Sequence, residues 1–126
     1  MYTHAFLGSN DVERSRKFYD ATMGALGHKN VLPAEAPRLV YNSGTGTLVI
    51  GKPLNGEAAN PSNGATLGFS GANNAQVDAW HAAGVANGGT CDGEPGPRAG
   101  APNNAYGAYL RDPDGNKVCC FNMKQG

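Results

Sequence analysis

The order of the expected elements repeats once along the chain, and this repeat constrains the fold more than any other feature. A short strand, a helix that begins at capping residues, another short strand and a hairpin occur twice, with a period of about 62 residues. Each half is too small to bury its own sheet. We therefore expect an α+β fold of two βαβββ modules, which form a curved mixed sheet with helices on the convex face. The opposite, concave face is a natural site for a small molecule.

In this interpretation the whole chain is one domain, with module one over 1–54, a turn-rich linker over 55–63 and module two over 64–126. In module one we expect strands over 3–8, 28–32, 38–42 and 47–51, and a helix over 12–26. In module two we expect strands over 65–70, 90–92, 105–111 and 117–122, a helix over 75–87 and a Gly/Pro loop over 93–104. Apolar residues spaced near every 3.6 positions support both helices.

The composition argues against several classes of partner. Ten Lys and Arg balance ten Asp and Glu, so we expect no nucleic acid and no anionic membrane as a partner. No apolar run is long enough to cross a membrane, and the first residues lack the pattern of a signal peptide. The three cysteines include the adjacent Cys119 and Cys120. We therefore expect no disulfide framework and a reducing, cytoplasmic location.

Several stretches together resemble a known family. They are HAFLG at 4–8 followed by NDVERSRKFY at 10–19, NGATLGF at 63–69, and the turn DPDGNK at 112–117. This combination resembles the vicinal oxygen chelate superfamily of glyoxalase I, extradiol dioxygenases and bleomycin-resistance proteins. The resemblance implies paired βαβββ modules, a homodimer, and a divalent metal held on the concave face by two His and two Glu, one from each of four strands. Such a metal binds two neighbouring substrate oxygens and stabilises the charge that develops on them.

The chain departs from that pattern at most of the implied ligand positions. His4 matches the first position. The second falls near Ile50, with Gly51 next to it, the third falls on Thr66, and the fourth falls on Cys119. The resemblance therefore implies a divergent member in which His4 is the only matching ligand, and we expect no metal cofactor.

The carboxylates support the same expectation without reference to a family. Nine of the ten lie in expected helices, loops or turns, and Asp92 ends the short strand expected over 90–92, so no carboxylate lies inside a strand and regular strands offer the sheet no acidic ligand. Only Glu35, in the loop before the strand at 38–42, is placed where it could swing toward the sheet.

The two-residue period of a strand predicts which side chains share a face. If His4 points into the cavity, Phe6 does so too, while Ala5 and Leu7 pack under a helix. The same rule puts Thr66, Gly68, Ser70, Lys117, Cys119 and Phe121 on the cavity side, and Leu67, Phe69, Val118 and Cys120 under the helices.

Polar and aromatic residues complete the expected cavity. Arg98, in a Gly/Pro loop, would suit a ligand carboxylate or phosphate, and Tyr41, Tyr106 and Tyr109 could stack on a bound molecule or only pack. His28 follows a helix end, His81 is expected at the surface, and Cys91 is expected to be structural. The full set of expected cavity residues is His4, Phe6, Ile50, Thr66, Arg98, Tyr106, Cys119 and Phe121.

Two residues are catalytic candidates. His4 could act as a base or a lone metal ligand, and Cys119 could act as a nucleophile if a nearby imidazole favoured its thiolate. A satisfied histidine at a sheet edge and an inert buried cysteine are the alternatives.

We expect a protein that binds a small molecule in its concave cavity without the usual metal. The alternative is a glyoxalase-type lyase or isomerase with a rearranged Zn, Ni, Mn or Fe site that uses His4, Cys119 and perhaps Glu35. A dioxygenase is a weaker fit, because its iron needs two His and a carboxylate together. A partner-binding module is a third interpretation, which no positive sequence feature favours.

Overall fold

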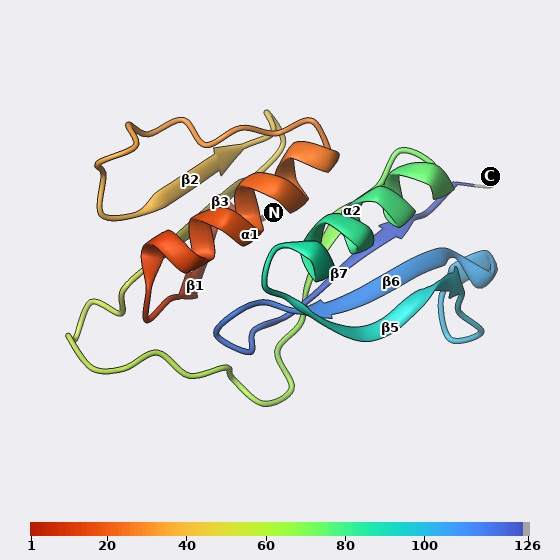
Figure 1. Ribbon diagram of the computed structural model, residues 1–126. Coiled ribbons are helices and arrows are strands. Elements are labelled where there is room, and N and C mark those ends of the chain that lie inside the picture. Colours follow the sequence, from red (N-terminus) through yellow and green to blue (C-terminus); the bar gives the residue numbers. More distant parts are fainter. Residues whose placement is uncertain (125–126) are drawn as a thin grey trace.

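The computed structural model describes residues 1–124 and confirms the α+β fold (Figure 1). Two helices and two mixed sheets follow one another in the repeated order expected from the sequence. In chain order the elements are β1 (Ala5–Gly8), α1 (Val12–Ala25), β2 (Leu39–Asn42), β3 (Thr47–Gly51), β4 (Leu67–Ser70), α2 (Asn74–Ala86), β5 (Thr90–Pro97), the 3₁₀ helix η1 (Pro102–Asn104), β6 (Tyr106–Arg111) and β7 (Lys117–Asn122).

The two sheets share one connection scheme. In module one, which comprises β1 to β3, the strand order is β1-β3-β2, with β1 parallel to β3. In module two, which comprises β4 to β7, the order is β4-β7-β6-β5, with β4 parallel to β7. In both modules a helix therefore connects the first strand to a set of antiparallel strands, the last of which returns beside the first strand.

Two expected segments differ from the structure. The strand expected over 28–32 is reduced to a single bridge between Asn30 and Tyr41, because Pro33 and the turn after it follow at once. The strand expected over 90–92 is longer, since β5 extends to Pro97 and takes in part of the expected loop. Its pairing with β6 shifts register twice, between Cys91 and Gly93 and between Gly93 and Gly96. At each shift β5 has one residue more than the facing segment of β6, as in a β-bulge.

Each helix begins at a side-chain cap, as the sequence predicts. The Asp11 side chain accepts the backbone N–H of Arg14 at 3.1 Å, and the Asn73 side chain accepts that of Gln76 at 2.8 Å. The two helices pack side by side (Figure 1). Gly84 permits this contact, because a Cβ there would overlap the Leu110 side chain and lie 3.1 Å from the Phe18 ring.

The helices cover one face of each sheet, and the alternation expected from the strand period is confirmed. Leu7, Leu67 and Phe69 pack against the core, and Val118 and Cys120 are fully buried within it. Phe6, on the opposite side of β1, remains 39% exposed. We call the sheet face that points away from α1 and α2 the open face.

The turn at 112–116 joins the modules as well as closing the last hairpin. Asp112 Oδ2 accepts the hydroxyl of Tyr19 from α1 at 2.6 Å. Asp114 Oδ1 accepts Arg14 Nη2 at 2.8 Å, and Asn116 Nδ2 donates to the carbonyl of Gly8 at 3.1 Å. Because these contacts link module two to β1 and α1, the turn fixes how the modules sit against each other.

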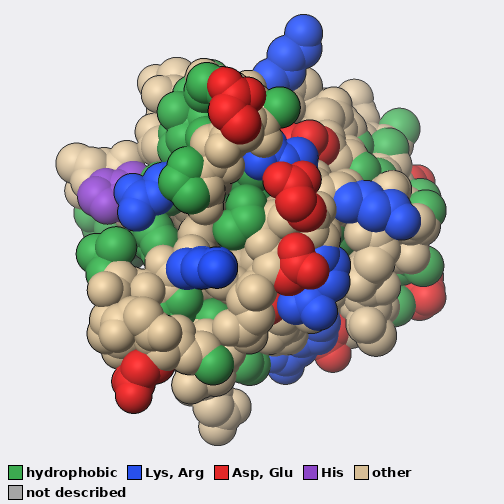
Figure 2. Space-filling model, turned by 60° about the vertical axis from the view of Figure 1, so that its left-hand side comes forward, with side chains coloured by type: hydrophobic (Ala, Val, Ile, Leu, Met, Phe, Trp, Pro, Cys, Tyr) green, Lys and Arg blue, Asp and Glu red, His purple; other side chains and the backbone are tan. Residues whose placement is uncertain are grey.

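Neither helix among the described residues is long and apolar enough to cross a membrane. On the face shown in Figure 2, acidic and basic side chains are interspersed, in keeping with a formal net charge of zero.

Candidate functional site

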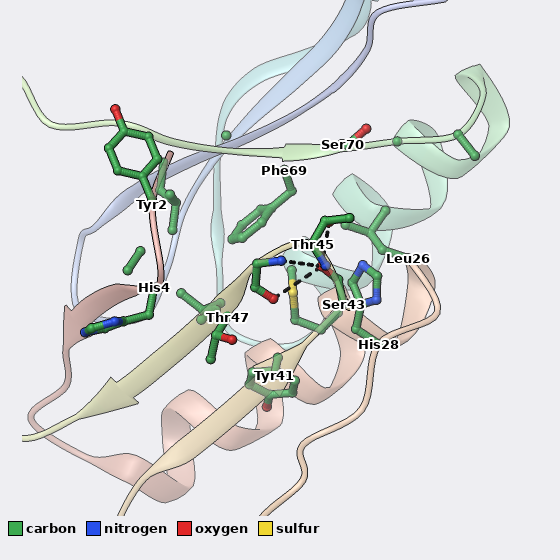
Figure 3. Close-up of a pocket in the computed structure, with 18 of the residues that line it drawn as sticks. Tyr2, His4, Leu26, His28, Tyr41, Ser43, Thr45, Thr47, Phe69 and Ser70 are labelled. Atoms are coloured by element: carbon green, nitrogen blue, oxygen red, sulfur yellow. Dashed lines mark hydrogen bonds between the residues drawn. The ribbon is translucent and has the colours of Figure 1, made fainter.

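A cavity of about 920 Å³ lies between the modules. Figure 3 shows its walls: the β2–β3 hairpin and the end of α1 on one side, and β4 with the residues before α2 on the other. The chain before β1 borders the cavity as well. The site therefore depends on how the two modules sit against each other.

The lining combines an apolar floor with a hydroxyl-rich rim. The floor includes side chains of the hydrophobic core that the two modules leave accessible, namely Met23, Leu26, Leu48 and Phe69. The rim carries hydroxyl groups from both modules, on Ser43, Thr45, Thr47, Thr66 and Ser70. Such a lining suits an organic molecule with an apolar body and several hydrogen-bonding groups.

The cavity lining carries a positive side chain and no negative one. Lys124 lines it, and no Asp or Glu of residues 1–124 does so. The lining therefore favours a neutral or anionic ligand over a cationic one.

Hydrogen bonds within the β2–β3 hairpin fix the hydroxyls on that side. Ser43 Oγ accepts the backbone N–H groups of Thr45 and Gly46 at 3.3 and 3.2 Å, and Asn42 Oδ1 accepts that of Gly44 at 2.8 Å. The Ser43 and Thr45 hydroxyls lie 3.1 Å apart. This wall is therefore arranged before any ligand arrives.

His4 and Thr66 line the cavity, whereas the other expected residues are distributed elsewhere. His4 is exposed at the mouth, with Nδ1 2.8 Å from the Thr3 hydroxyl, and its ring points away from the centre (Figure 3). A base at that position could reach only the outer part of a bound molecule.

Arg98 and Phe121 line a second, smaller hollow of about 460 Å³ on the open face of module two. The Arg98 guanidinium lies 5.7 Å from the ring centre of Tyr109, and that ring meets Phe121 edge-on. Arg98 Nη2 also donates to the carbonyl of Glu94 at 2.6 Å. The guanidinium is thus engaged with the backbone of β5.

Ile50 and Tyr106 are corrections to the expected site. Ile50 is fully buried in the core, because it shares with Leu48 the face of β3 that lies under the helices. Tyr106 also lies on the helix side, where its hydroxyl donates to Asp78 of α2 at 2.5 Å. Neither side chain lines either hollow.

On the open face of β3, Gly51 occupies the position next to Ile50. A Cβ there would lie 3.4 Å from the Phe6 ring and 3.2 Å from Cβ of Arg38. The Arg38 guanidinium in turn lies over the Phe6 ring, 5.8 Å from its centre. Phe6 and Arg38 therefore fill the space in which a metal-binding side chain from β3 would have to fit.

Cys119 is buried and lines neither hollow. Burial raises the pKa of its thiol, an effect that the charge of Lys117 only partly opposes. Cys119 therefore stays protonated at neutral pH and is a poor nucleophile there.

The residues at the implied ligand positions do not fit the metal centre of the resembled family. They supply one exposed imidazole, one hydroxyl and one buried thiol, and neither Ile50 nor Gly51 of β3 supplies a donor side chain. Within residues 1–124, His4, Cys119 and Glu35 do not form a group whose donor atoms lie within 4.8 Å of one another. Among the residues that the structure describes, the one group of that kind lies elsewhere, at His81, Cys91 and Glu94.

Sequence reasoning missed the hairpin wall of the cavity. Ser43, Thr45 and Thr47 lie in or next to a hairpin turn. The glycines of that turn already explain the segment as a connection between two strands, so nothing in the sequence indicated a binding role. The sequence feature that could have indicated this wall is the number of hydroxyl side chains around the turn. Whether these side chains face β4 depends, however, on how the two modules pack.

Ser70, which the period of β4 places on the cavity side, lines the cavity, but so do Leu67 and Phe69, which the same period places under a helix. The cavity therefore extends between the modules and is not confined to the concave face, contrary to the expectation from the sequence.

Comparisons with known proteins place this architecture in context. The family model described as Glyoxalase/Bleomycin resistance protein/Dioxygenase superfamily matches residues 2–120. A glyoxalase/bleomycin resistance protein from Albidiferax ferrireducens T118 shares 48% sequence identity over 98% of this chain and 99% of that chain, with a TM-score of 0.88. No curated protein matches the chain.

More distant solved structures share the fold. A glyoxalase-related enzyme from Fulvimarina pelagi has a TM-score of 0.76 at 20% identity, over 97% of this chain and 87% of that one. Lactoylglutathione lyase from Agrobacterium tumefaciens has a TM-score of 0.67 at 21% identity, over 98% and 93%.

Proposed function

Because the chain belongs to the glyoxalase/bleomycin resistance protein/dioxygenase superfamily, we propose that it binds an organic small molecule between its modules. Binding uses the apolar floor and the hydroxyl rim of the cavity. It does not use a metal at His4, Gly51, Thr66 and Cys119.

The observation that carries this proposal is the lining of the 920 Å³ cavity. Its volume lies within the range of about 300 to 1,000 Å³ that is usual for small-molecule sites. The floor can exclude water from an apolar ring, while the hydroxyls and Lys124 can bind oxygen substituents or an anionic group. An aromatic or polyoxygenated molecule, neutral or negatively charged, meets all of these conditions.

The relative from Albidiferax ferrireducens supports this proposal. That relative is described as a glyoxalase/bleomycin resistance protein, and the two chains are 48% identical over nearly their whole lengths. Sequestration of a ligand, as opposed to its chemical conversion, is the simpler function for a cavity whose lining includes no Asp, Glu or Cys of residues 1–124.

The first experiment is native mass spectrometry on tag-free protein as purified, which measures the mass of any retained organic molecule.

We also propose that the protein is a homodimer in a reducing, cytoplasmic environment, and the same spectrum measures the mass of the dimer. All three cysteines are free, which suits such an environment.

A binding assay locates the site with a defined probe. Anilinonaphthalene sulfonate has an aromatic body and one anionic group, so its fluorescence should rise when it enters the cavity. Thr66→Trp fills the rim and should weaken binding about fivefold or more, which corresponds to about 1 kcal/mol. Ser62→Trp is the matched control, because Ser62 is exposed in the linker and lies outside the cavity lining.

Far-UV circular dichroism shows whether both variants are folded. If folded Thr66→Trp binds the probe as tightly as Ser62→Trp does, the cavity is not the binding site. If instead a divalent ion copurifies and is lost in His4→Ala, the lyase alternative replaces this proposal.

A further inference from the structure

Away from the cavity, three side chains of different chemistry converge between α2 and β5. His81 Nε2 lies 3.2 Å from Cys91 Sγ, and Cys91 Sγ lies 3.3 Å from Glu94 Oε1. One donor atom from each residue lies within 4.8 Å of the other two. None of the three belongs to the ligand positions that the family resemblance implies.

His81 is the buried member of this cluster, with only 7% of its surface exposed. The sequence-based expectation of a surface residue is wrong because His81 shares one helical stripe with Val77, Trp80 and Gly84, all of which are buried. Burial holds the imidazole in place against β5. A buried ring nitrogen that points at a sulfur is a potential metal ligand whose position is already fixed.

The irregular pairing of β5 brings Cys91 and Glu94 to the same side of the sheet. In a regular strand, residues three apart point to opposite faces. Here the register shifts between Cys91 and Gly93, and an extra residue restores both side chains to the side of α2. The bulge therefore produces the cluster.

Arg98 fixes the backbone around Glu94. Its two terminal nitrogens donate to the carbonyl of Glu94 at 2.6 Å and to that of Gly96 at 3.0 Å. The same guanidinium stacks over Tyr109 on the open face. The strand segment that carries Glu94 is thus held from the opposite side of the sheet, while its carboxylate stays exposed and free to adjust.

The chemistry of the cluster suits a cation. The Cys91 thiol donates a hydrogen bond to Glu94 Oε1 at 3.3 Å, and a divalent ion would take the place of the thiol proton between the two side chains. A nucleophilic cysteine would need the imidazole beside it and no anion, so the position of Glu94 argues against that role. A divalent ion would bind all three donors at once.

The spacing of the donors fits a tetrahedral ion. Bonds of about 2.0 to 2.3 Å place neighbouring donors of one zinc ion about 3.3 to 3.6 Å apart. The two contacts to Cys91 are already close to that spacing, and a small movement of the exposed Glu94 side chain would bring in the third donor.

We propose that His81, Cys91 and Glu94 form a binding site for a divalent transition metal of the zinc class. One nitrogen, one sulfur and one oxygen are the donors that zinc accepts. The fourth position faces solvent, since Cys91 and Glu94 are exposed. The ion would tie α2 to β5 and, with an open position, could also bind a ligand oxygen.

The test uses the full-length protein under reducing conditions, with Zn²⁺ in calorimetry and Co²⁺ in absorption titrations. We expect one ion per chain and, for Co²⁺, a near-ultraviolet charge-transfer band that requires a thiolate ligand. Cys91→Ser should abolish the band and weaken Zn²⁺ binding about 100-fold or more, and Glu94→Gln should weaken it about tenfold. Both residues are exposed, so these variants should fold.

Matched controls separate this site from others. Cys119→Ser removes a buried thiol, Glu57→Gln removes an exposed carboxylate in the linker, and His4→Ala removes the one family-matching histidine. All three should bind Zn²⁺ as the wild type does. The proposal is overturned if the wild type binds no stoichiometric Zn²⁺ at micromolar concentration, or if Cys91→Ser binds it as tightly as the wild type.

Discussion

The two modules share one connection scheme but differ in the strand that follows each helix. In module one that strand is reduced to the single bridge between Asn30 and Tyr41, whereas in module two it is the eight-residue, bulged β5. The cavity borders the reduced segment, since His28 and Tyr41 line it. The His81, Cys91 and Glu94 cluster lies between α2 and the extended strand. The candidate sites thus occur where the copies diverge, and the shared elements supply the scaffold.

The junction between the modules should give the largest effect. Asp112 accepts hydrogen bonds from the Tyr19 hydroxyl, from the Asn116 amide side chain and from the backbone N–H groups of Asp114 and Asn116. Asp112→Asn turns one acceptor oxygen into a donor, so it should lower the free energy of unfolding by about 3 kcal/mol in urea denaturation.

The control for Asp112→Asn is Asp92→Asn, which removes a partly exposed ion pair with Arg111 and should cost about 0.5 kcal/mol. If the modules depended little on each other, Asp112→Asn would instead split the urea transition into two steps.

Three tyrosine–aspartate hydrogen bonds sharpen the comparison, because one crosses between the modules and two stay inside one module each. Tyr19→Phe removes the buried bond to Asp112 across the junction and should cost about 2 kcal/mol. Tyr41→Phe removes the partly buried bond to Asp20 within module one and should cost about 1 kcal/mol. Thermal and urea unfolding of the set measure these differences.

Tyr106→Phe completes this set, because it removes an exposed bond to Asp78 within module two and should cost about 0.5 kcal/mol or less. The opposite order, with the smallest loss in Tyr19→Phe, would mean that the junction contributes little to stability.

The smallest expected effect is a pH dependence at the junction. Burial raises the pKa of the Asp112 carboxyl above its ordinary value, although hydrogen bonds from Tyr19 and Asn116 oppose this rise. A raised pKa in the folded state means that the protonated carboxyl favours folding. Its contribution is full below the ordinary aspartate value of about 4 and declines as the pH rises through the folded-state value.

The stability difference between the wild type and Asp112→Asn should therefore be larger near pH 4 than at pH 7. Urea denaturation at the two pH values measures it. A difference that grows from pH 4 to pH 7 would mean that the hydrogen bonds outweigh burial.

Much of the scaffold could be predicted from the sequence, because it follows from local rules. The helix cap at Asn73 follows from side-chain chemistry, and the burial of Leu67, Phe69 and Val118 follows from the two-residue strand period. The turn after Arg111 follows from its Asp, Pro and Gly residues.

The sites could be predicted less well, because they depend on register and packing. A shift of one residue separates Ile50 in the core from Gly51 on the open face. The segment at 90–97 contains two Gly and two Pro, which favour a loop, yet pairing with β6 holds it as a strand. The cavity exists only once the β2–β3 hairpin and β4 face each other.

The most direct test is an anomalous difference map at the zinc absorption edge from crystals of the wild-type protein grown with Zn²⁺. We expect a peak between His81, Cys91 and Glu94 and none at His4 or at Cys119. A peak at His4 or Cys119, or no peak at the cluster, would contradict the claim that the metal chemistry of this chain has moved away from the family's usual metal positions.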